Sequence, residues 1–185
     1  MKTWALVLFS IACAPAIADE SLWRRIASEE NIVVLTRHMR SAGVNPLAWD
    51  ETGACRGEHV LTPEGRADAQ MLGRLFKERS IRPVVISSPM CRCVETAKIA
   101  FGGAIVDPAL RETASADRAR AQEFERVATG LLAKHRGRAP IVFVSHRPNI
   151  DWLTMELVDD GDLVVGKVDD AGRVDVIGRM KLDVP

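Results

Sequence analysis

The sequence predicts a three-layer α/β/α sandwich with a mainly parallel sheet and an antiparallel hairpin at its edge. Three observations lead to this prediction. Short runs rich in Val and Ile alternate with longer segments of helical periodicity, turn residues separate them, and two strand patterns in succession close the chain. Continuous apolar runs are typical of strands that are buried on both faces, as the strands of a parallel sheet are.

The first half of the chain supplies one strand and one helix of this sandwich. A β-branched run at residues 32–36 follows a short amphipathic segment at residues 22–27, and it predicts the first strand. Residues 41–61 contain Gly and Pro and show little periodicity, so they predict a long loop, a feature that is usually functional. A helix is expected after this loop, because Thr62 is a suitable N-cap and Pro63 suits the first helical position.

The second half repeats the alternation of strands and helices. Helices are expected at residues 91–101, where Gly102 follows as a stop signal, at residues 118–135, and from Pro148 to about residue 157. The predicted strands are 84–86, 105–106 and 141–144, followed by a hairpin of 163–168 and 174–177. Because no repeat or linker interrupts this pattern, residues 19–185 are predicted to form a single domain.

Polar residues follow three of the predicted strands at the point where each strand ends. Arg37 and His38 follow the first strand, His146 follows the third buried strand, and Ser88 follows the second, shortly before Arg92. In open α/β sheets, ligands bind beyond the carboxyl ends of the strands. We therefore expect these side chains to converge on one site.

Composition and charge exclude several classes of function. The chain has 185 residues, 47% of them hydrophobic and 27% charged, which is typical of a globular domain large enough to bury a core. Its formal net charge is +0, so no overall field attracts nucleic acid or an anionic membrane surface. A nucleic-acid partner is not expected, and any anion site must be built locally.

The first eighteen residues have the pattern of a secretory signal. Lys2 provides a positive start, residues 4–14 form an apolar run too short to span a bilayer, and small residues occupy positions 16 and 18. Cleavage is predicted between Ala18 and Asp19. The mature protein is then expected to be periplasmic or secreted, without stable membrane insertion.

Export would make a disulfide possible among the three cysteines that remain. Cys91 and Cys93 are too close in sequence to pair comfortably, so a bridge is expected from Cys55 to one of them. Such a bridge would stabilise the fold by roughly 3 to 4 kcal/mol in the chain-entropy description. A zinc site is not expected, because this spacing lacks a tetrahedral ligand set.

Five ordered blocks of the sequence resemble the histidine phosphatase superfamily. The Arg37-His38 pair is weak evidence alone, but the order of the blocks is specific. They are Leu35-Thr36-Arg37-His38, Leu61-Thr62-Pro63-Glu64-Gly65-Arg66, Ser87-Ser88-Pro89 with Arg92 and Glu95-Thr96-Ala97, Leu110-Arg111-Glu112, and Val144-Ser145-His146. The resemblance spans the mature chain.

The resemblance implies a role for the polar residues of these blocks. His38 would be the nucleophile that carries a phosphohistidine, since a neutral imidazole attacks phosphorus and its phosphoramidate is easily hydrolysed. Arg37 and Arg92 would bind the phosphoryl oxygens, and His146 would complete the catalytic pocket as a further donor. Glu112 would be the general acid and then the base. No metal and no cofactor are implied.

The chain also departs from the common pattern of this superfamily. Many members carry Gly-Glu after the first Arg-His, whereas Met39 and Arg40 stand here, and many have Gly after the second His, where this chain has Arg147. Arg40 and Arg147 are therefore candidate substrate-binding residues. Glu58, in the long loop, is the alternative to Glu112 as the general acid.

These observations favour an exported, metal-independent phosphatase that acts on a small-molecule or glycan phosphomonoester. An envelope glycan such as a heptose phosphate is a candidate substrate by analogy with the family. A mutase is less favoured, because its bisphosphate cofactor is cytosolic. The alternative is a non-catalytic protein of the same fold that binds a phosphorylated ligand. The sequence does not indicate an oligomeric state.

Overall fold

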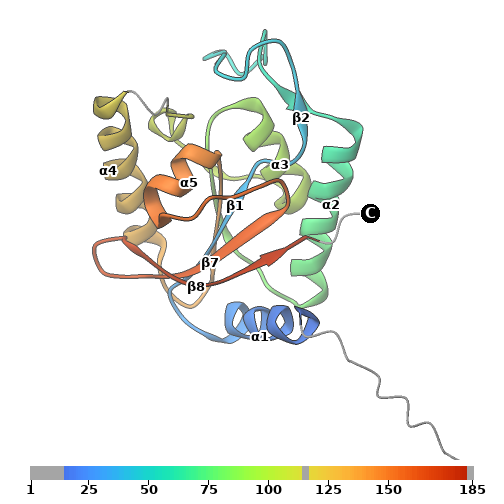
Figure 1. Ribbon diagram of the computed structural model, residues 1–185, viewed down its shortest axis with the longest axis vertical. Helices are drawn as coiled ribbons and strands as arrows, with labels where there is room; N and C mark the ends of the chain where they lie inside the picture. Colours follow the sequence, from blue (N-terminus) through green and yellow to red (C-terminus); the bar gives the residue numbers. More distant parts are fainter. Residues whose placement is uncertain (1–14, 114–116, 183–185) are drawn as a thin grey trace, which may run out of the picture.

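A six-stranded sheet forms the centre of the computed structural model, which describes residues 15–113 and 117–182 (Figure 1). The strand order is β5-β4-β6-β1-β7-β8. Strands β5, β4, β6 and β1 are parallel to one another, and β7 pairs antiparallel with both β1 and β8. The strands are β1 (Ile32–Arg37), β4 (Val84–Ser87), β5 (Ile105–Val106), β6 (Ile141–Ser145), β7 (Asp162–Val168) and β8 (Val174–Lys181). The predicted mainly parallel sheet with an antiparallel edge hairpin is confirmed.

Helices cover both faces of this sheet and complete the three layers (Figure 1). One face packs against α1 (Pro15–Ser28), α2 (Pro63–Glu78) and α3 (Cys91–Phe101). The other face packs against α4 (Arg118–His135) and α5 (Arg147–Thr154), and a 3-10 turn, Pro108–Leu110, precedes α4.

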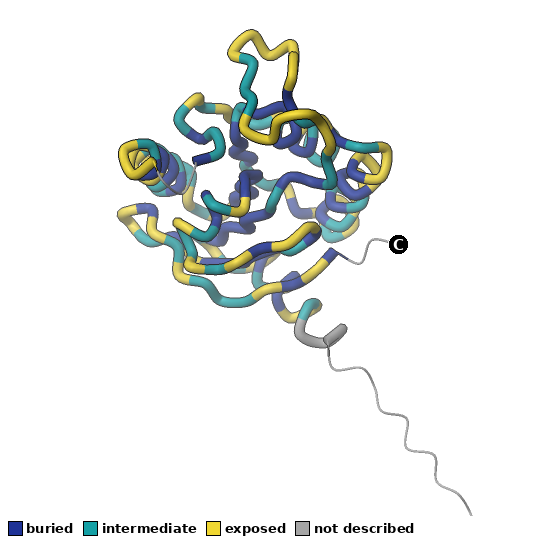
Figure 2. The backbone as a smooth tube through the Cα atoms, turned by 45° about the horizontal axis from the view of Figure 1, so that its top comes forward, coloured by how far each residue is buried: buried dark blue, intermediate teal, exposed yellow. Residues whose placement is uncertain are grey.

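The central strand β1 shows why its apolar run is continuous. Val34 packs into the core beneath α1, α2 and α3, whereas Val33 and Leu35 pack into the core beneath α4 and α5. Successive side chains of a strand point to opposite faces, so a strand covered on both sides needs an apolar residue at every position. Interior strands are accordingly the buried, dark blue part of the tube in Figure 2.

Local signals in the sequence set the ends of two helices as predicted. The Thr62 side chain caps α2 by accepting a hydrogen bond from the amide of Gly65 at 3.1 Å. At the end of α3, Gly102 adopts a left-handed φ of 89°, which a residue with a Cβ disfavours.

The predicted loop at residues 41–61 is shorter than expected. Its ends pair as a two-stranded antiparallel sheet of β2 (Ser41–Ala42) and β3 (Val60–Leu61), which leaves residues 43–59 as the loop. Two-residue strands carry no periodicity, so the sequence gives no signal for them. The loop rises above the carboxyl ends of the parallel strands and is largely exposed (Figure 2).

Two other predicted ends are also wrong. The last helix stops at Thr154, because Met155 takes a left-handed φ of 59° and ends α5 before residue 157. The last strand continues past residue 177 to Lys181, because Gly178 remains in register with β7. A Cβ at Gly178 would lie 2.8 Å from the side chain of Leu22, so glycine here permits close packing of α1 rather than ending the strand.

The amino-terminal helix bears on the predicted signal sequence. The helix α1 starts at Pro15, so the predicted cleavage point between Ala18 and Asp19 falls within it. Residues 1–14, which hold most of the predicted signal, lie outside the described residues. Cleavage at this point stays a prediction. Among the described helices, none has the length and apolar character needed to cross a membrane.

We predict that the contact between α2 and α3 depends on Gly73. A Cβ at this position would overlap the backbone carbonyl of Ala100, with the carbonyl carbon 3.0 Å away. Gly73→Ala is therefore expected to lower the free energy of unfolding by about 2 kcal/mol, because the added methyl group overpacks the contact. This loss outweighs the gain from the higher helix propensity of alanine. Urea denaturation monitored by circular dichroism measures this change.

Gly130, in α4, is the matched control, because a Cβ built there meets no described atom within 4 Å apart from its chain neighbours and the backbone of its own helix. Gly130→Ala should raise the free energy of unfolding by about 0.5 to 1 kcal/mol. Equal effects of the two substitutions would contradict the assigned close contact at Gly73.

Candidate active site

The carboxyl ends of three neighbouring strands bring the predicted residues together. In the parallel register, Arg37 of β1 lies opposite Ser145 of β6, and the amide of His38 donates to the Ser145 carbonyl at 3.0 Å. The amide of Ser88, after β4, donates to the carbonyl of Val144 at 3.0 Å. The rings of His38 and His146 consequently lie with their centroids 5.5 Å apart.

His38 is held as a neutral imidazole with one free nitrogen. Its side chain is buried, and Nδ1 lies 2.9 Å from the carbonyl oxygen of Met39. Since a carbonyl only accepts, Nδ1 carries the hydrogen, and Nε2 keeps its lone pair. Burial lowers the pKa of His38 to about 3, and the charges of Arg92 and Arg37 add to this effect. The ring is therefore neutral over the whole neutral pH range and has a free lone pair with which it could act as a nucleophile.

Arg92 is a buried cation at the centre of the site. Its side chain, from the first turn of α3, is 2% exposed, and Nη2 donates to Glu112 Oε2 and lies 3.1 Å from His146 Nδ1. The other terminal nitrogen, Nη1, is buried with no hydrogen-bond partner in the described structure. A buried donor without an acceptor is unfavourable, so an anion bound at Nη1 would be stabilised.

The tautomer of His146 follows from its two neighbours. Arginine only donates, so Nδ1 accepts from Arg92, and Nε2 carries the hydrogen that it donates to the Ser88 hydroxyl at 2.7 Å. Burial lowers the pKa of His146 well below its usual value, and the charges of Arg92, His38 and Arg37 lower it further. The Cys93 sulfur also lies 3.5 Å from Nε2.

Glu112 lies next to Arg92 at the rim of this pocket. Its Oε2 is 3.7 Å from His146 Nδ1. Burial raises the pKa of Glu112, although the charges of Arg92 and Arg37 act in the opposite direction. A carboxyl group with a raised pKa can hold a proton nearer to neutral pH, as a general acid must.

The structure distinguishes Glu112 from Glu58, the alternative general acid. Both oxygens of Glu58 accept backbone hydrogen bonds, from the amide of Asp50 at 2.7 Å and from the amide of Cys91 at 2.8 Å. Glu58 therefore fastens the loop to the start of α3, whereas Glu112 is the carboxylate that contacts Arg92.

Two residues that help to position the site, Asn149 and Cys93, were not among the side chains predicted to lie in it. Asn149 of α5 holds the segment that carries Glu112: its Oδ1 accepts from the Thr113 amide at 3.0 Å, and its Nδ2 donates to the Arg111 carbonyl at 3.1 Å. Ser88 and Cys93 contact His146. A polar residue in the first turn of a helix beside a predicted site was the available signal for Asn149, but such residues are common.

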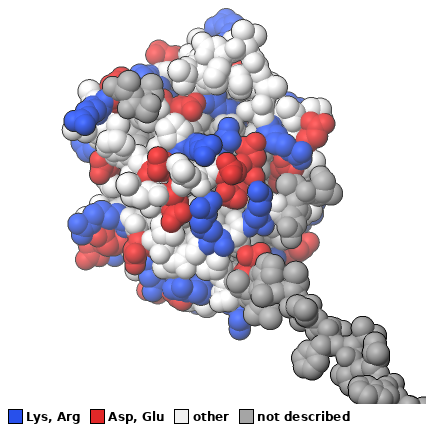
Figure 3. Space-filling model, viewed as in Figure 1, with Lys and Arg blue, Asp and Glu red and all other residues white. Residues whose placement is uncertain are grey.

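The other predicted substrate-binding arginines are paired with carboxylates. Arg37 Nη1 lies 2.6 Å from Asp160, and Arg147 lies 3.7 Å from Asp159. Arg40 makes two hydrogen bonds to Asp68 of α2, at 2.6 and 2.7 Å. Figure 3 shows basic and acidic side chains next to each other across this face of the molecule.

Of these three, Arg37 is near enough for its charge to affect His38, His146 and Glu112. Direct binding of substrate by Arg40 and Arg147 stays a prediction. Ion pairs at partly exposed positions are weak, so an incoming phosphate can compete with Asp160 for Arg37.

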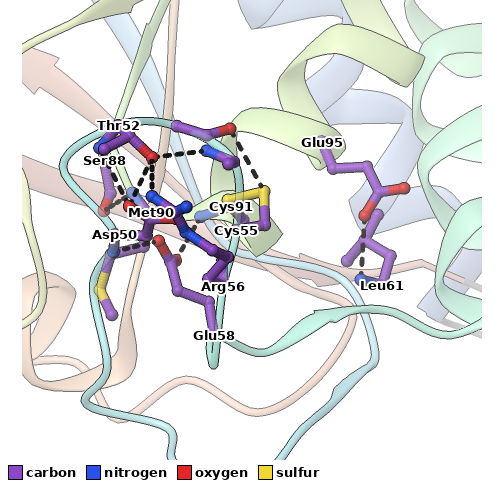
Figure 4. The surroundings of a disulfide bond; sticks show 12 residues. Asp50, Thr52, Cys55, Arg56, Glu58, Leu61, Ser88, Met90, Cys91 and Glu95 are labelled. Atoms are coloured by element: carbon purple, nitrogen blue, oxygen red, sulfur yellow. Dashed lines mark hydrogen bonds and ion pairs between the residues drawn. A yellow bond between two sulfur atoms is a disulfide. The ribbon is translucent and has the colours of Figure 1, made fainter.

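A disulfide joins the loop to the helix that carries Arg92 (Figure 4). Cys55 and Cys91 are bridged with their Cα atoms 5.8 Å apart, and Cys93 is a buried free thiol. This is one of the two pairings expected from the sequence. The bridge and the Glu58 hydrogen bonds hold the loop at the residue before Arg92, so the loop cannot shift independently of the site.

Within the described ranges, no three His, Cys, Asp or Glu side chains cluster closely enough to hold a metal ion. The positive charge of the site comes from Arg92 and Arg37.

A comparison with protein families identifies the class of this protein. Residues 33–125, half of the chain, match the histidine phosphatase superfamily (branch 1). The match contains Arg37, His38, Arg92 and Glu112. The chain therefore belongs to the histidine phosphatase superfamily, as its sequence blocks predict.

Solved structures show the same fold. The protein histidine phosphatase SixA complexed with tungstate is 16% identical over 81% of this chain and 96% of its own, with a TM-score of 0.57. A protein from Thermus thermophilus is 23% identical over 82% of this chain and 99% of its own, also with a TM-score of 0.57. Phosphoserine phosphatase from Entamoeba histolytica in complex with 3-phosphoglyceric acid is 13% identical over 82% and 98%, with a TM-score of 0.55. No curated protein sequence matches the chain significantly.

We predict that the buried histidines make the fold less stable below neutral pH. The lowered pKa means that the unfolded chain binds these protons and the folded chain does not, so stability is complete above the usual pKa of 6.5 and falls below it. Between about pH 7 and about pH 5, His38 should cost about 2 kcal/mol of unfolding free energy, and His146 should add a loss of the same sign. Urea denaturation at a series of pH values measures this loss. Glu112 acts with the opposite sign, because its raised pKa favours the protonated folded state as pH falls.

His38→Gln should therefore make the pH profile of stability shallower than that of the wild type. His135→Gln, in the last turn of α4 and away from the site, is the control and should leave the slope unchanged. Parallel profiles for wild type and His38→Gln would contradict the neutral, buried state assigned to His38.

Proposed function

We propose that this protein is a metal-independent phosphatase that hydrolyses phosphate monoesters through a phosphohistidine on His38. The observation that carries this proposal is the neutral His38 beside a buried Arg92 whose Nη1 has no hydrogen-bond partner among the described residues. A phosphoryl group bound between these two side chains would satisfy the open donor and meet the nucleophile. Membership of the histidine phosphatase superfamily supports the same reaction.

The first step transfers the phosphoryl group to the protein. Arg92 and Arg37 neutralise the charge of the phosphoryl oxygens, which is the main requirement for phosphoryl transfer. His38 Nε2 then forms a bond to phosphorus while the bond from phosphorus to the ester oxygen breaks. Glu112, in its protonated form, gives its proton to the leaving oxygen.

The second step reverses the role of Glu112. Its carboxylate takes a proton from a water molecule, whose oxygen bonds to phosphorus as the bond to His38 Nε2 breaks. Inorganic phosphate leaves, His38 returns to the neutral imidazole, and Glu112 is protonated again. Direct donation from His146 to the phosphoryl group stays a prediction, since Nδ1 accepts from Arg92 and Nε2 donates to Ser88 in the structure.

A second candidate function is a non-catalytic protein that binds a phosphorylated ligand in the same pocket. An ionised Glu112 would stay paired with Arg92 and could not give a proton to a leaving group, which would favour this alternative. The raised pKa of Glu112 supports catalysis instead, because a protonated Glu112 releases Arg92 for the phosphate.

We further propose that the enzyme is exported and acts on a sugar phosphate or glycan of the cell envelope. The signal pattern in residues 1–18 supports export. The Cys55–Cys91 disulfide agrees with an oxidising compartment, where such bonds persist.

The phosphatase proposal is tested with residues 19–185 and p-nitrophenyl phosphate in the presence of EDTA. The wild type should release nitrophenol, and His38→Ala should reduce kcat by roughly a thousandfold or more, because no other described nucleophile occupies its place. Quenching during turnover with alkaline SDS, in which phosphohistidine persists, should trap phosphate on the wild type, and this label should be absent from His38→Ala. A phosphorylated His38→Ala protein would contradict the proposal.

Glu112→Gln separates the two candidate functions. The nitrophenolate of p-nitrophenyl phosphate can leave without a proton, whereas the alkoxide of glycerol 2-phosphate needs one. Glu112→Gln should therefore reduce turnover of glycerol 2-phosphate by more than that of p-nitrophenyl phosphate. If the wild type bound tungstate but turned over no phosphate ester, the non-catalytic function would be favoured.

Export is tested by the mass of the mature protein. We expect the protein recovered from the periplasm or medium to begin at Asp19, with Cys55 and Cys91 oxidised. An intact Met1 on the protein isolated from its native host would contradict this expectation.

A further inference from the structure

A cleft lies beside Glu112 on the side where the leaving group must depart. Its volume is about 320 Å³, and its lining includes Trp49 from the loop, Met90 and Glu112 from the site, and Arg111 and Arg120. The proposed general acid protonates the oxygen of the leaving group, so that group must contact Glu112. The cleft that Glu112 lines is therefore the space available to the rest of the substrate.

Two guanidinium groups in this cleft have no carboxylate partner. Most arginines whose contacts are described, among them Arg37, Arg40 and Arg147, form ion pairs. Arg111 and Arg120 form none with any residue in the described ranges, although both are partly buried. Partly buried cations without a counter-ion favour the binding of an anion.

The acidic side chain of the cleft does not neutralise these arginines. Asp117 also lines it, but its Oδ1 accepts a hydrogen bond from the backbone amide of Arg120 at 3.1 Å and caps α4. Glu112 contacts Arg92 in the ionised form and carries no charge in the protonated form that catalysis requires. Positive charge therefore prevails in the cleft when the substrate binds.

Trp49 holds Arg111 in a position suited to an anion. The guanidinium carbon of Arg111 lies 4.7 Å from the centroid of the Trp49 ring. Stacking uses the flat face of a guanidinium group and leaves its N–H donors free at the edge. Arg111 can therefore stay stacked while it donates to a carboxylate or a phosphate.

The loop that carries Trp49 is fixed before substrate arrives. The next residue, Asp50, donates its amide to Glu58, and Glu58 accepts from Cys91, which is itself bridged to Cys55 (Figure 4). A preorganised subsite loses little conformational entropy on binding, so its contacts contribute more to affinity.

We propose that this cleft is the leaving-group subsite and that it selects phosphate monoesters whose leaving group carries a second anionic group. Arg120 and Arg111 bind the second anion, and Trp49 packs against the carbon skeleton between the two charged ends. The inference rests on the proposed phosphatase function for the orientation of the substrate. It goes further by naming the chemical class of substrate that the site prefers.

The test uses two esters of nearly equal size, 4-carboxyphenyl phosphate and its neutral amide, 4-carbamoylphenyl phosphate. Calorimetry with His38→Ala measures binding without turnover, and steady-state kinetics with the wild type measures kcat/KM. The carboxylate should bind about tenfold more tightly than the amide, as a hydrogen-bonded charge pair allows. Arg120→Ala, introduced into the wild type and into His38→Ala, should abolish this preference. It should raise KM for the carboxylate and leave kcat and the binding of the amide nearly unchanged.

Arg120→Lys should retain part of the preference, since it keeps the charge but loses the planar donor group. Arg118→Ala, in the same helical turn but exposed and outside the cleft, is the matched control and should retain the full preference. Equal affinity for the two esters, or equal weakening of both by Arg120→Ala, would overturn the inference. If His38→Ala bound the carboxylate preferentially but the wild type hydrolysed neither ester, the subsite would stand and the phosphatase function would fall.

Discussion

The burial of one cation, Arg92, is the constraint on which the rest of the site depends. Its side chain is 2% exposed and its guanidinium group contacts His146 and Glu112, so water cannot readily solvate the charge. The Glu112 carboxylate and His146 Nδ1 accept hydrogen bonds from Nη2, and Nη1 is left with no partner among the described residues, so it is available to a ligand. The same charge helps to lower the pKa of both histidines and opposes the rise in the pKa of Glu112. Burial is the largest cause of all three pKa shifts, and the charge of Arg92 adjusts each of them.

The scaffold keeps this costly arrangement in place through covalent and hydrogen-bonded contacts around the first turn of α3. Cys91, the residue before Arg92, is bridged to the loop and donates its amide to Glu58. On the other side, Asn149 fastens the segment that carries Glu112. These contacts leave Arg92 and Glu112 little freedom to separate. His38, Arg92 and His146 lie at strand and helix ends, whereas the proposed leaving-group subsite takes Trp49 and Arg111 from loops and Arg120 from the first turn of α4. This division allows substrate preference to change without disturbing the chemistry.

Much of the fold and the central site could be predicted because their signals are local. Continuous apolar runs marked the buried strands, and Thr62 and Gly102 marked helix ends by the backbone geometry that they favour. The positions of His38, Arg92 and His146 after or near strand ends were enough to expect them in one place. The pairing of Ser41–Ala42 with Val60–Leu61 could not be predicted, since two residues carry no period. The continuation of the last strand through Gly178 could not be predicted either, since its packing against Leu22 depends on a distant part of the chain.

The sequence by itself determined the class of the protein, a mainly parallel α/β sandwich of the histidine phosphatase superfamily, and predicted His38, Arg92 and His146 in one site. Tertiary structure alone decided which carboxylate faces Arg92, which cysteine pairs with Cys55, and which arginines have no carboxylate partner among the described residues. The physical reason is the range of the interactions. Strand burial and helix caps depend on neighbours in the chain, whereas the charge state and availability of a side chain depend on groups that only folding brings within a few ångströms.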